Sequence, residues 1–109
     1  MASLTPEETA AREHIAEWLA LYRTLARDLL GIRDDKDFAS ILGISRSHYS
    51  EIASKQSTPG IKVLLRLRRE YRASIDAIFD RVPDERDREN ARSSVSAVSN
   101  ERRHNHAAG

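Results

Sequence analysis

The sequence predicts an all-helical protein, and two observations support that prediction. Apolar residues recur at steps of three and four in several separate segments, which is the spacing of a helix with one buried face. No segment alternates apolar and polar residues with a period of two, so no strand is expected. A chain of 109 residues has room for one domain and a tail.

The first predicted helix is long. Thr5 is placed to cap it, Pro6 suits its first position, and Gly31 is placed to end it. One apolar stripe runs between them and comprises Ile15, Trp18, Leu19, Tyr22, Leu25, Ala26 and Leu29. Because this stripe is longer than one compact domain needs, we expect part of the helix to contact a second copy or another protein.

Two short helices follow, separated by a glycine. Asp34 or Asp35 can cap the first of them, which is predicted to bury Phe38, Ala39 and Leu42. Gly43 then breaks the helix and allows the chain to reverse sharply. Ser45 offers a new cap for the second helix, which is predicted to bury Tyr49 and Ile52.

Two further helices complete the predicted domain of five. Thr58 and Pro59 repeat the cap-then-proline start, and the helix after them is predicted to bury Ile61, Leu64, Leu65, Leu67 and Tyr71. Ser74 can cap the last helix, which is predicted to turn inward Ile75, Ile78 and Phe79. Val82 marks the end of the predicted order.

The C-terminal part is predicted to be a disordered tail. Its composition is mainly Arg, Glu, Asp, Ser, Asn and His without apolar periodicity, so burial cannot offset the entropy of ordering. A helical start over residues 84–94 is the alternative, and the tail is a second candidate for a partner contact. The expected organisation is a long N-terminal helix at residues 1–31, a domain core at 32–82 and a tail at 83–109.

Composition excludes several classes of protein. With 39% hydrophobic and 32% charged residues the chain is typical of a globular domain, and no apolar run approaches the ~20 residues of a membrane span. The first residues lack the pattern of a secretion signal, and without cysteine there is no disulfide. We therefore expect a cytoplasmic protein that makes no membrane contact.

The charge is distributed unevenly. Residues 61–81 hold six basic and three acidic side chains, a net of +3 in a chain whose net charge is +1. The arginines and the lysine of this segment either meet phosphate groups or form a solvated helix face, and the sequence leaves both open.

No constellation predicts an enzyme, a metal site or a cofactor. The aspartates of residues 34–37 lack the glycine and distal glutamate of a calcium loop and are typical of a helix start. His104 and His106 lack a third ligand. The serines and histidine of residues 45–48 share one short helix with no orienting acid or oxyanion hole.

The most informative stretch is residues 37–52, DFASILGISRSHYSEI. Two helices of about two turns meet at Gly43, and Ala39, four positions earlier, lets them pack closely. With its apolar side chains inward, the second helix must direct outward Arg46, Ser47, Ser50, Glu51 and Ser54. A helix held in this way, with small and polar residues outward, fits the major groove of DNA.

This stretch resembles the lambda-repressor-like (XRE, Cro/CI-type) helix-turn-helix family. The resemblance runs from about Asp34 to Phe79 and rests on Phe38-Ala39, Leu42-Gly43-Ile44-Ser45, Tyr49, Ile52, Pro59, Ile61, Leu64, Leu67, Ser74-Ile75-Asp76 and Ile78-Phe79. It implies a five-helix DNA-binding domain of a transcription regulator, such as a phage-type repressor. Since one short recognition helix usually needs a second half-site, we expect a homodimer that reads a near-palindromic operator in double-stranded DNA.

The resemblance also implies a DNA-binding surface on the helix at residues 46–54 and the loop after it. Ser45 would cap that helix and touch a phosphate, while the other members of the implied set are Arg46, Ser47, His48, Ser50, Glu51, Ser54, Lys55 and Ser57. Arg46, Ser47 and Glu51 would occupy the base-reading positions. Arg46 can pair in bidentate fashion with guanine, and Glu51 can accept from the cytosine amino group. The last three members of the set would face the backbone or neighbouring bases.

Three positions depart from the family's pattern. Asp35 stands where a glutamine commonly donates to a phosphate, and Ala53 stands where a glutamate often pairs with a buried arginine of the first helix. Lys55 stands where a glycine often follows the recognition helix. Because the acidic start of the second helix repels the DNA backbone, an alternative function stays open: an interaction module or antitoxin-like partner with weak or no DNA binding.

Overall fold

In the computed structural model, which describes residues 4–108 and the side chains of residues 4–102, the chain folds into six helices and no strand. They are α1 (Pro6–Leu30), α2 (Asp35–Ile41), α3 (Arg46–Ala53), α4 (Ile61–Tyr71), α5 (Ile75–Asp80) and α6 (Glu85–Ala108). The predicted all-helical class is confirmed, and so is the extended first helix.

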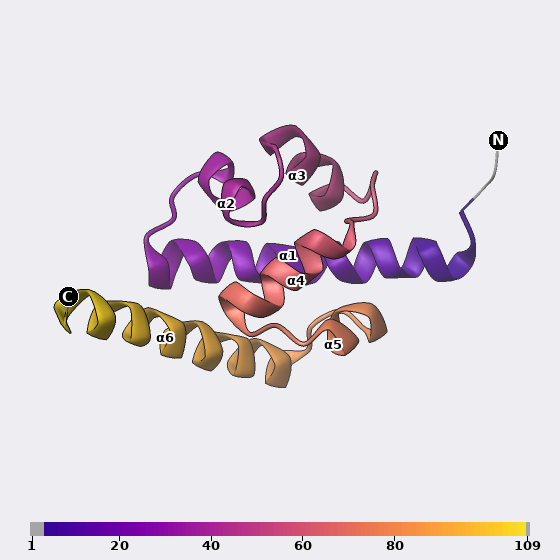
Figure 1. Ribbon diagram of the computed structural model, residues 1–109. Helices are drawn as coiled ribbons and strands as arrows, with labels where there is room; N and C mark the ends of the chain where they lie inside the picture. Colours follow the sequence, from indigo (N-terminus) through magenta and orange to yellow (C-terminus); the bar gives the residue numbers. More distant parts are fainter. Residues whose placement is uncertain (1–3, 109) are drawn as a thin grey trace.

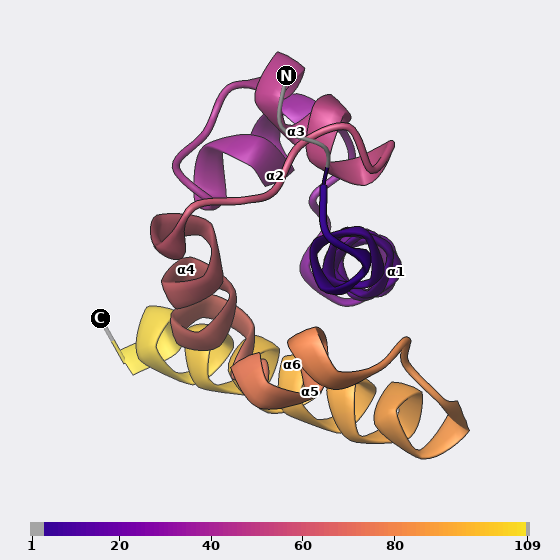
Figure 2. The ribbon, with the colours of Figure 1, turned by 90° about the vertical axis from the view of Figure 1, so that its right-hand side faces the viewer.

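α1 is the axis around which the other helices are arranged. It runs through the middle of the molecule, with α2 and α3 on one side and α5 and α6 on the other (Figure 1). An end-on view down α1 shows α4 beside it, between these two layers (Figure 2). The result is an elongated molecule of 54 × 30 × 20 Å.

The ends of α1 follow the predicted capping signals. The Thr5 hydroxyl accepts a hydrogen bond from the Glu8 N–H at 3.1 Å, and Pro6 occupies the first helical position. Gly31 has φ of 72°, the left-handed conformation that glycine adopts without steric cost, and its N–H donates to Ala26. The backbone thus ends α1 where the chain must turn toward α2.

The apolar stripe of α1 is buried by other helices of the same chain. From Ile15 to Ala26 its large side chains are buried, and α1 contacts α3, α5 and α6 along this length. The stripe is long because it also packs against the second layer, which consists of α5 and α6, and the sequence did not predict α6. The stripe therefore does not present an open face to a partner.

Five of the six aromatic side chains form one continuous row through the core. The successive ring centroids lie 6.2, 5.7, 6.0 and 5.5 Å apart, in the order Trp18, Tyr22, Tyr71, Phe38 and Tyr49. Each such pair contributes about 0.5–1.5 kcal/mol beyond the area it buries. Because the row draws on α1, α4, α2 and α3 in turn, it joins four helices in one packing unit.

The start of α4 and the buried faces of α4 and α5 differ from the prediction. Gly60, not Thr58, is the N-cap residue of α4. Ile61 and Leu65 are 73% and 43% exposed, because Val63, Leu64, Leu67 and Tyr71 define the buried face and a single step along a helix turns a side chain by about 100°. For the same reason Ile78 of α5 is buried whereas Phe79 is 43% exposed.

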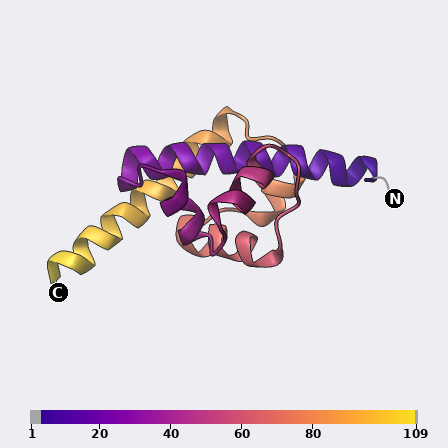
Figure 3. The same ribbon diagram turned by 90° about the horizontal axis from the view of Figure 1, so that it is seen from above.

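The predicted disordered tail was wrong, because residues 85–108 form α6. Ala91, Val95 and Val98 recur at steps of four and three and are buried against α1 and α4. This stripe consists of small side chains among serines, so its periodicity is easily overlooked. The C-terminal turns of α6 extend beyond the helices on which it packs (Figure 3).

Polar contacts fasten α6 along its length. The Ser99 hydroxyl donates to the Leu29 carbonyl at 3.1 Å, which satisfies a carbonyl in the last turn of α1. Arg102 of α6 donates to Glu70 of α4 at 2.6 Å, and Glu101 of α6 pairs with Arg72, which directly follows α4. Two ion pairs therefore join α6 to the end of α4, and α6 supplies the cation in one and the anion in the other.

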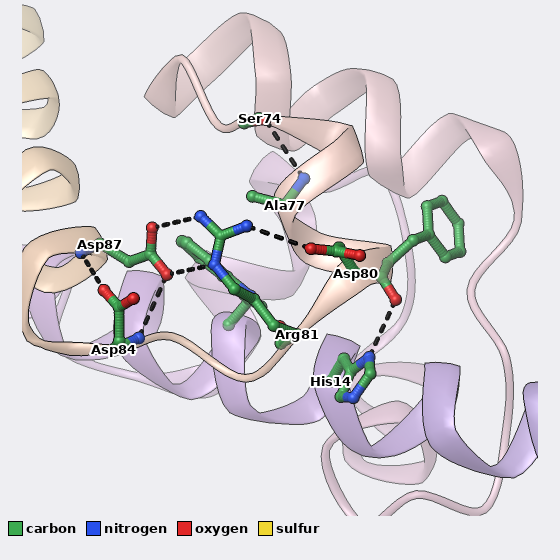
Figure 4. Close-up of polar contacts among 9 residues, drawn as sticks. His14, Ser74, Ala77, Asp80, Arg81, Asp84 and Asp87 are labelled. Carbon is green, nitrogen blue, oxygen red and sulfur yellow. Dashed lines mark hydrogen bonds and ion pairs between the residues drawn. The ribbon is translucent and has the colours of Figure 1, made fainter.

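The start of α6 is fixed by a reciprocal capping arrangement. The Asp84 carboxylate accepts from the Asp87 N–H at 2.8 Å, and the Asp87 carboxylate accepts from the Asp84 N–H at 3.1 Å. Arg81 donates two further hydrogen bonds to Asp87, at 2.9 and 2.8 Å (Figure 4). The Arg81 carbonyl accepts from the Trp18 indole at 2.7 Å, so the same loop is tied to α1.

We predict that Asp87→Asn lowers the free energy of unfolding by about 2 kcal/mol at neutral pH, because two charge-assisted hydrogen bonds from Arg81 are weakened. Urea denaturation of the full chain measures this change. Asp80→Asn is the matched control, since Asp80 bonds the same arginine but its side chain is 73% exposed, and it should change stability by less than about 0.5 kcal/mol.

The effect of Asp87→Asn should also depend on pH. The hydrogen bonds from Arg81 lower the pKa of Asp87 below its ordinary value, while burial of the carboxyl opposes this only in part. Its ionised form therefore stabilises the fold above the pKa of the unfolded chain, about 3.9, and this contribution is lost as the pH falls through the lower pKa of the folded state. A difference between the two proteins that persists unchanged at about pH 3 would contradict this account.

Candidate functional site

α3 is held with one face in the core and the other in solvent. The Ser45 hydroxyl accepts from the His48 N–H at 3.1 Å, which confirms the predicted N-cap. Tyr49 and Ile52 are buried, and the Tyr49 ring meets the Phe38 ring edge-on at 5.5 Å. These anchors fix the rotation of α3 about its axis, so the opposite face is presented to the surroundings.

The structure gathers the predicted site residues on this one surface. The following are exposed: Ser45, Arg46, Ser47, Ser50, Glu51, Ser54 and Lys55. His48 and Ser57 are partly buried. The Ser54 hydroxyl donates to the carbonyls of Ser50 and Glu51, at 2.9 and 3.2 Å, so it closes the last turn of α3.

The two cations of this surface stand at opposite ends of α3. Arg46 is the first residue of the helix, and Lys55 lies just beyond its C-cap residue Ser54. Within residues 4–102 neither of them takes part in an ion pair. The face between them is small and polar and carries one carboxylate, Glu51.

Lys55 occupies a left-handed backbone conformation, with φ of 68°. Its N–H donates to the Ile52 carbonyl at 3.1 Å, and the next N–H, of Gln56, donates to Glu51 at 2.8 Å. The turn therefore satisfies carbonyls at the end of α3 in the way a terminal glycine usually does. A side chain in this conformation costs about 1–2 kcal/mol, so the position carries strain that a glycine would relieve.

The loop between α3 and α4 is fastened to α1 by Arg12. The guanidinium donates to the Thr58 hydroxyl at 2.8 Å and to the Gln56 carbonyl at 3.1 Å. The long first helix thus positions the segment that carries Lys55 and Ser57. Arg12 lies off the apolar stripe of α1 and nothing in its local sequence distinguishes it, so sequence reasoning missed it.

An open groove of about 400 Å³ lies between the start of α2 and the start of α3. Arg33 and Lys36 line it together with Arg46, and both are exposed. They extend the cationic end of α3 toward α2. The sequence analysis did not include either of them, although their position directly beside the aspartates of α2 was visible.

The aspartates at the start of α2 are used by the fold. The Asp34 carboxylate accepts from the Asp37 N–H at 2.9 Å and caps α2. Asp35 pairs with Arg23 of α1, whose side chain is only 15% exposed, at 2.9 Å. Of the three carboxylates only Asp37 has neither role, so the repulsion expected from the triplet is reduced.

Arg23 is a partly buried arginine of α1, and its carboxylate partner is Asp35 of α2 and not a residue of α3. It donates to the carbonyls of Ile32 and Arg33 at 3.0 and 2.8 Å, and its guanidinium lies 5.7 Å from the centre of the Phe38 ring. This geometry is consistent with the prediction, made from Ala53, that no arginine of α1 pairs with a glutamate of α3. Ala53 is exposed, and the arginine instead joins α1 to the start of α2 through Asp35.

The basic residues of α4 do not form one surface. The Lys62 side chain lies over Gly43, where a Cβ atom would stand 2.8 Å from its flexible Cε, and the φ of 75° is what favours glycine at that turn. Arg72, at the other end, pairs with Glu101 of α6. Only the Lys62 end of α4 therefore lies beside the α2–α3 turn.

The described side chains contain no group of three or more His, Asp or Glu that could hold a metal ion. His104 and His106 lie outside the described side chains. None of the helices has both the length and the apolar character needed to cross a membrane, as far as the structure describes them.

Comparison with known proteins identifies a family. A family model described as helix-turn-helix matches residues 25–78, from the last turns of α1 into α5. No curated protein and no solved structure matches the chain. The matched segment contains the whole of α2 and α3, and it leaves out most of α1 and all of α6.

We predict that Lys55→Gly raises the free energy of unfolding by about 0.5–1 kcal/mol, because relief of the left-handed strain exceeds the added entropy of glycine in the unfolded chain. Lys55→Ala removes the same amine but keeps the strain, and it should change stability by less than about 0.5 kcal/mol. Thermal denaturation of both variants separates the two effects, and equal stability of the two variants would contradict the strain at this turn.

Proposed function

Residues 25–78 make this chain a member of the lambda-repressor-like helix-turn-helix family, and from this premise we propose that the protein is a DNA-binding transcription regulator. We propose further that it acts as a repressor in the cytoplasm, without enzymatic activity. α3 would be its recognition helix. The observation that supports this best is the exposed polar face of α3, with Arg46 and Lys55 at its two ends and neither of them in an ion pair within residues 4–102.

The geometry of α3 supports different tasks for its two ends. Its N-terminal turn carries Arg46 and Ser47, whose side chains can reach base edges in the major groove. Lys55, after the last turn, would meet the phosphate backbone. Arg33 and Lys36 in the groove beside Arg46 supply further cations to the neighbouring strand. Phosphate contacts would then hold α3 in register while its first turn reads bases.

We propose that the regulator binds DNA as a homodimer on a near-palindromic site. α3 has eight residues, so one copy can read only a few base pairs. Ile61 and Leu65 lie one turn apart on α4 and are exposed, directly after the loop that follows α3. A second copy packed on this face would bury them and would bring two recognition helices to the same side of the dimer.

The alternative function is that of an interaction module or antitoxin-like partner with weak or no DNA binding. The acidic start of α2 is the feature that favours it. Since Asp34 caps α2 and Asp35 is paired with Arg23, the structure gives this feature less weight than the sequence did.

DNA titration tests the proposal and separates the roles of the residues. A preferred site is first selected from a random pool of duplexes. We expect Arg46→Ala to cost about 1–3 kcal/mol on that site and to flatten the preference at one base pair, because one bidentate contact is lost. We expect Lys55→Ala to weaken binding to all sequences and to reduce the salt slope by about one, because a phosphate contact is lost.

Two controls sharpen this titration. Arg88 is exposed on α6, on the far side of α1, and Arg88→Ala should leave both affinity and base preference unchanged. Lys55→Gly should behave on DNA as Lys55→Ala does, since both remove the amine. If the wild type binds DNA and Arg46→Ala changes nothing, α3 is not the recognition helix. If the wild type binds no duplex at low salt, the interaction module is the correct function.

We predict that Ile61→Glu lowers the oligomeric state, because a charge on an exposed apolar face opposes its burial against a second copy. Sedimentation of the full chain should show half the mass of the wild type. Binding to the palindromic site should weaken, whereas binding to an isolated half-site should not change. Ala20→Glu, on an exposed position of α1, is the control and should keep the dimer. A variant at position 61 that stays dimeric would assign the interface elsewhere.

A further inference from the structure

Residues 6–24 of α1 precede the segment that matches the helix-turn-helix family. This part of α1 is tied to the α5 side of the molecule by two hydrogen bonds. Nδ1 of His14 donates to the Phe79 carbonyl at 2.9 Å, as Figure 4 shows, and the Trp18 indole donates to the Arg81 carbonyl at 2.7 Å. The N-terminal part of α1 is therefore a fixed support for whatever it contacts on its other side.

Arg12 leaves α1 on that other side, because the two residues between it and His14 turn a helix by about 200°. Its Nε donates to the Thr58 hydroxyl at 2.8 Å, and its Nη1 donates to the Gln56 carbonyl at 3.1 Å. Within residues 4–102 these are the only hydrogen bonds that join residues 56–60 to an element other than α3 and α4. The α3–α4 loop thus depends on Arg12 for its polar contact with the first helix.

The contact acts directly beside the strained turn at the end of α3. Lys55 has φ of 68°, and a side chain in this conformation persists only where the surrounding structure holds it. The N–H of Gln56, the next residue, donates to the Glu51 carbonyl at 2.8 Å, and its carbonyl accepts from Arg12. Both backbone groups of Gln56 are therefore engaged, which limits how the backbone that carries Lys55 can move.

Arg12 also adds positive charge to this loop. Both of its acceptors are neutral, and within residues 4–102 it takes part in no ion pair. Its side chain is partly buried. Since no carboxylate neutralises the guanidinium, its charge adds to that of Lys55 and makes the loop more favourable to an anion.

We propose that Arg12 is a positioning residue for DNA binding, an inference that rests on the proposed function. Its planar fork holds the α3–α4 loop in the conformation in which Lys55 and Ser57 meet a phosphate, before DNA is bound. The loop then does not have to be ordered at the expense of binding free energy. In this way the part of α1 outside the family segment belongs to the DNA-binding apparatus.

Limited proteolysis with trypsin tests the contact without DNA. Trypsin cleaves after lysine and arginine, and Lys55 places one such bond at the start of the loop. Arg12→Lys keeps the charge but loses the planar fork. We expect this variant to be cleaved after Lys55 at least about threefold faster, because the loop opens more often, and to be cleaved after Arg46 at the rate of the wild type.

Two further variants check that the effect belongs to this contact. Thr58→Val removes one acceptor and leaves the arginine in place, so it should also speed cleavage after Lys55. Arg27→Lys is the matched control on α1, because Arg27 is 59% exposed and pairs only with its neighbour Asp28. It should leave cleavage after Lys55 unchanged.

DNA titration on the selected site then tests the role in binding. Arg12→Lys should lower the affinity about three- to tenfold and reduce the salt slope, because a mobile loop makes its phosphate contact for only part of the time. The losses from Arg12→Lys and Lys55→Ala should not add, since both variants affect the same contact. The losses from Arg12→Lys and Arg46→Ala should add, because Arg46 stands at the other end of α3.

The outcomes separate the contact, its role and the proposed function. Equal cleavage after Lys55 in the wild type and Arg12→Lys overturns the contact. Faster cleavage with unchanged affinity and salt slope, or losses that add with Lys55→Ala, overturns the role of Arg12 in binding. A wild type that binds no duplex at low salt refutes the proposed function and with it this role, while the trypsin result still decides whether Arg12 holds the loop.

Discussion

The stacking of Tyr71 between Tyr22 and Phe38 is the contact on which the arrangement of this protein depends. Its ring centre lies 5.7 Å from one neighbour and 6.0 Å from the other, so a single side chain of α4 joins α1 to α2. Tyr49 extends the row to α3. The orientation of the outward face of α3 therefore follows from packing that begins in α1, although α3 itself has only eight residues. A short helix gains its rigidity from this row and not from its own length.

The electrostatic potential around α3 depends more on which charges are paired in the folded chain than on how many charges the nearby sequence contains. The three aspartates within residues 34–37 suggest a surface that repels a polyanion such as DNA. In the folded chain Asp34 caps α2, and Asp35 is paired with Arg23, whose guanidinium lies over the ring of Phe38. The cations near α3 have no such partners among residues 4–102. Since opposite charges already paired contribute little to the field at a distance, the surface is more favourable to phosphate than the local sequence indicates.

Much of the fold could be predicted from the sequence because local signals specify it. Capping side chains and terminal glycines act within four residues, and Thr5, Gly31, Ser45 and Ser74 all perform the predicted roles. The exposure of the α3 face followed from two buried anchors. The predictions that failed concern contacts between residues far apart in the sequence. They are which residues beside Leu64 on α4 face the core, which groups accept hydrogen bonds from Arg12 and Arg23, and which helix covers the second face of α1. The roles of the individual site residues on DNA stay predictions.

α6 shows why the second layer was hidden and what it does to the molecule. Its buried face consists of Ala91, Val95 and Val98, which together remove little apolar surface from water, so its docking relies on polar contacts such as Arg81 with Asp87 and Ser99 with Leu29. These partners are far apart in the sequence or appear as ordinary surface charges, and no local pattern reveals them. The same small side chains let α6 lie close to α1, where its Ser99 hydroxyl reaches the Leu29 carbonyl. Close approach and weak apolar docking thus have one physical cause, which makes the polar contacts decisive for the position of α6.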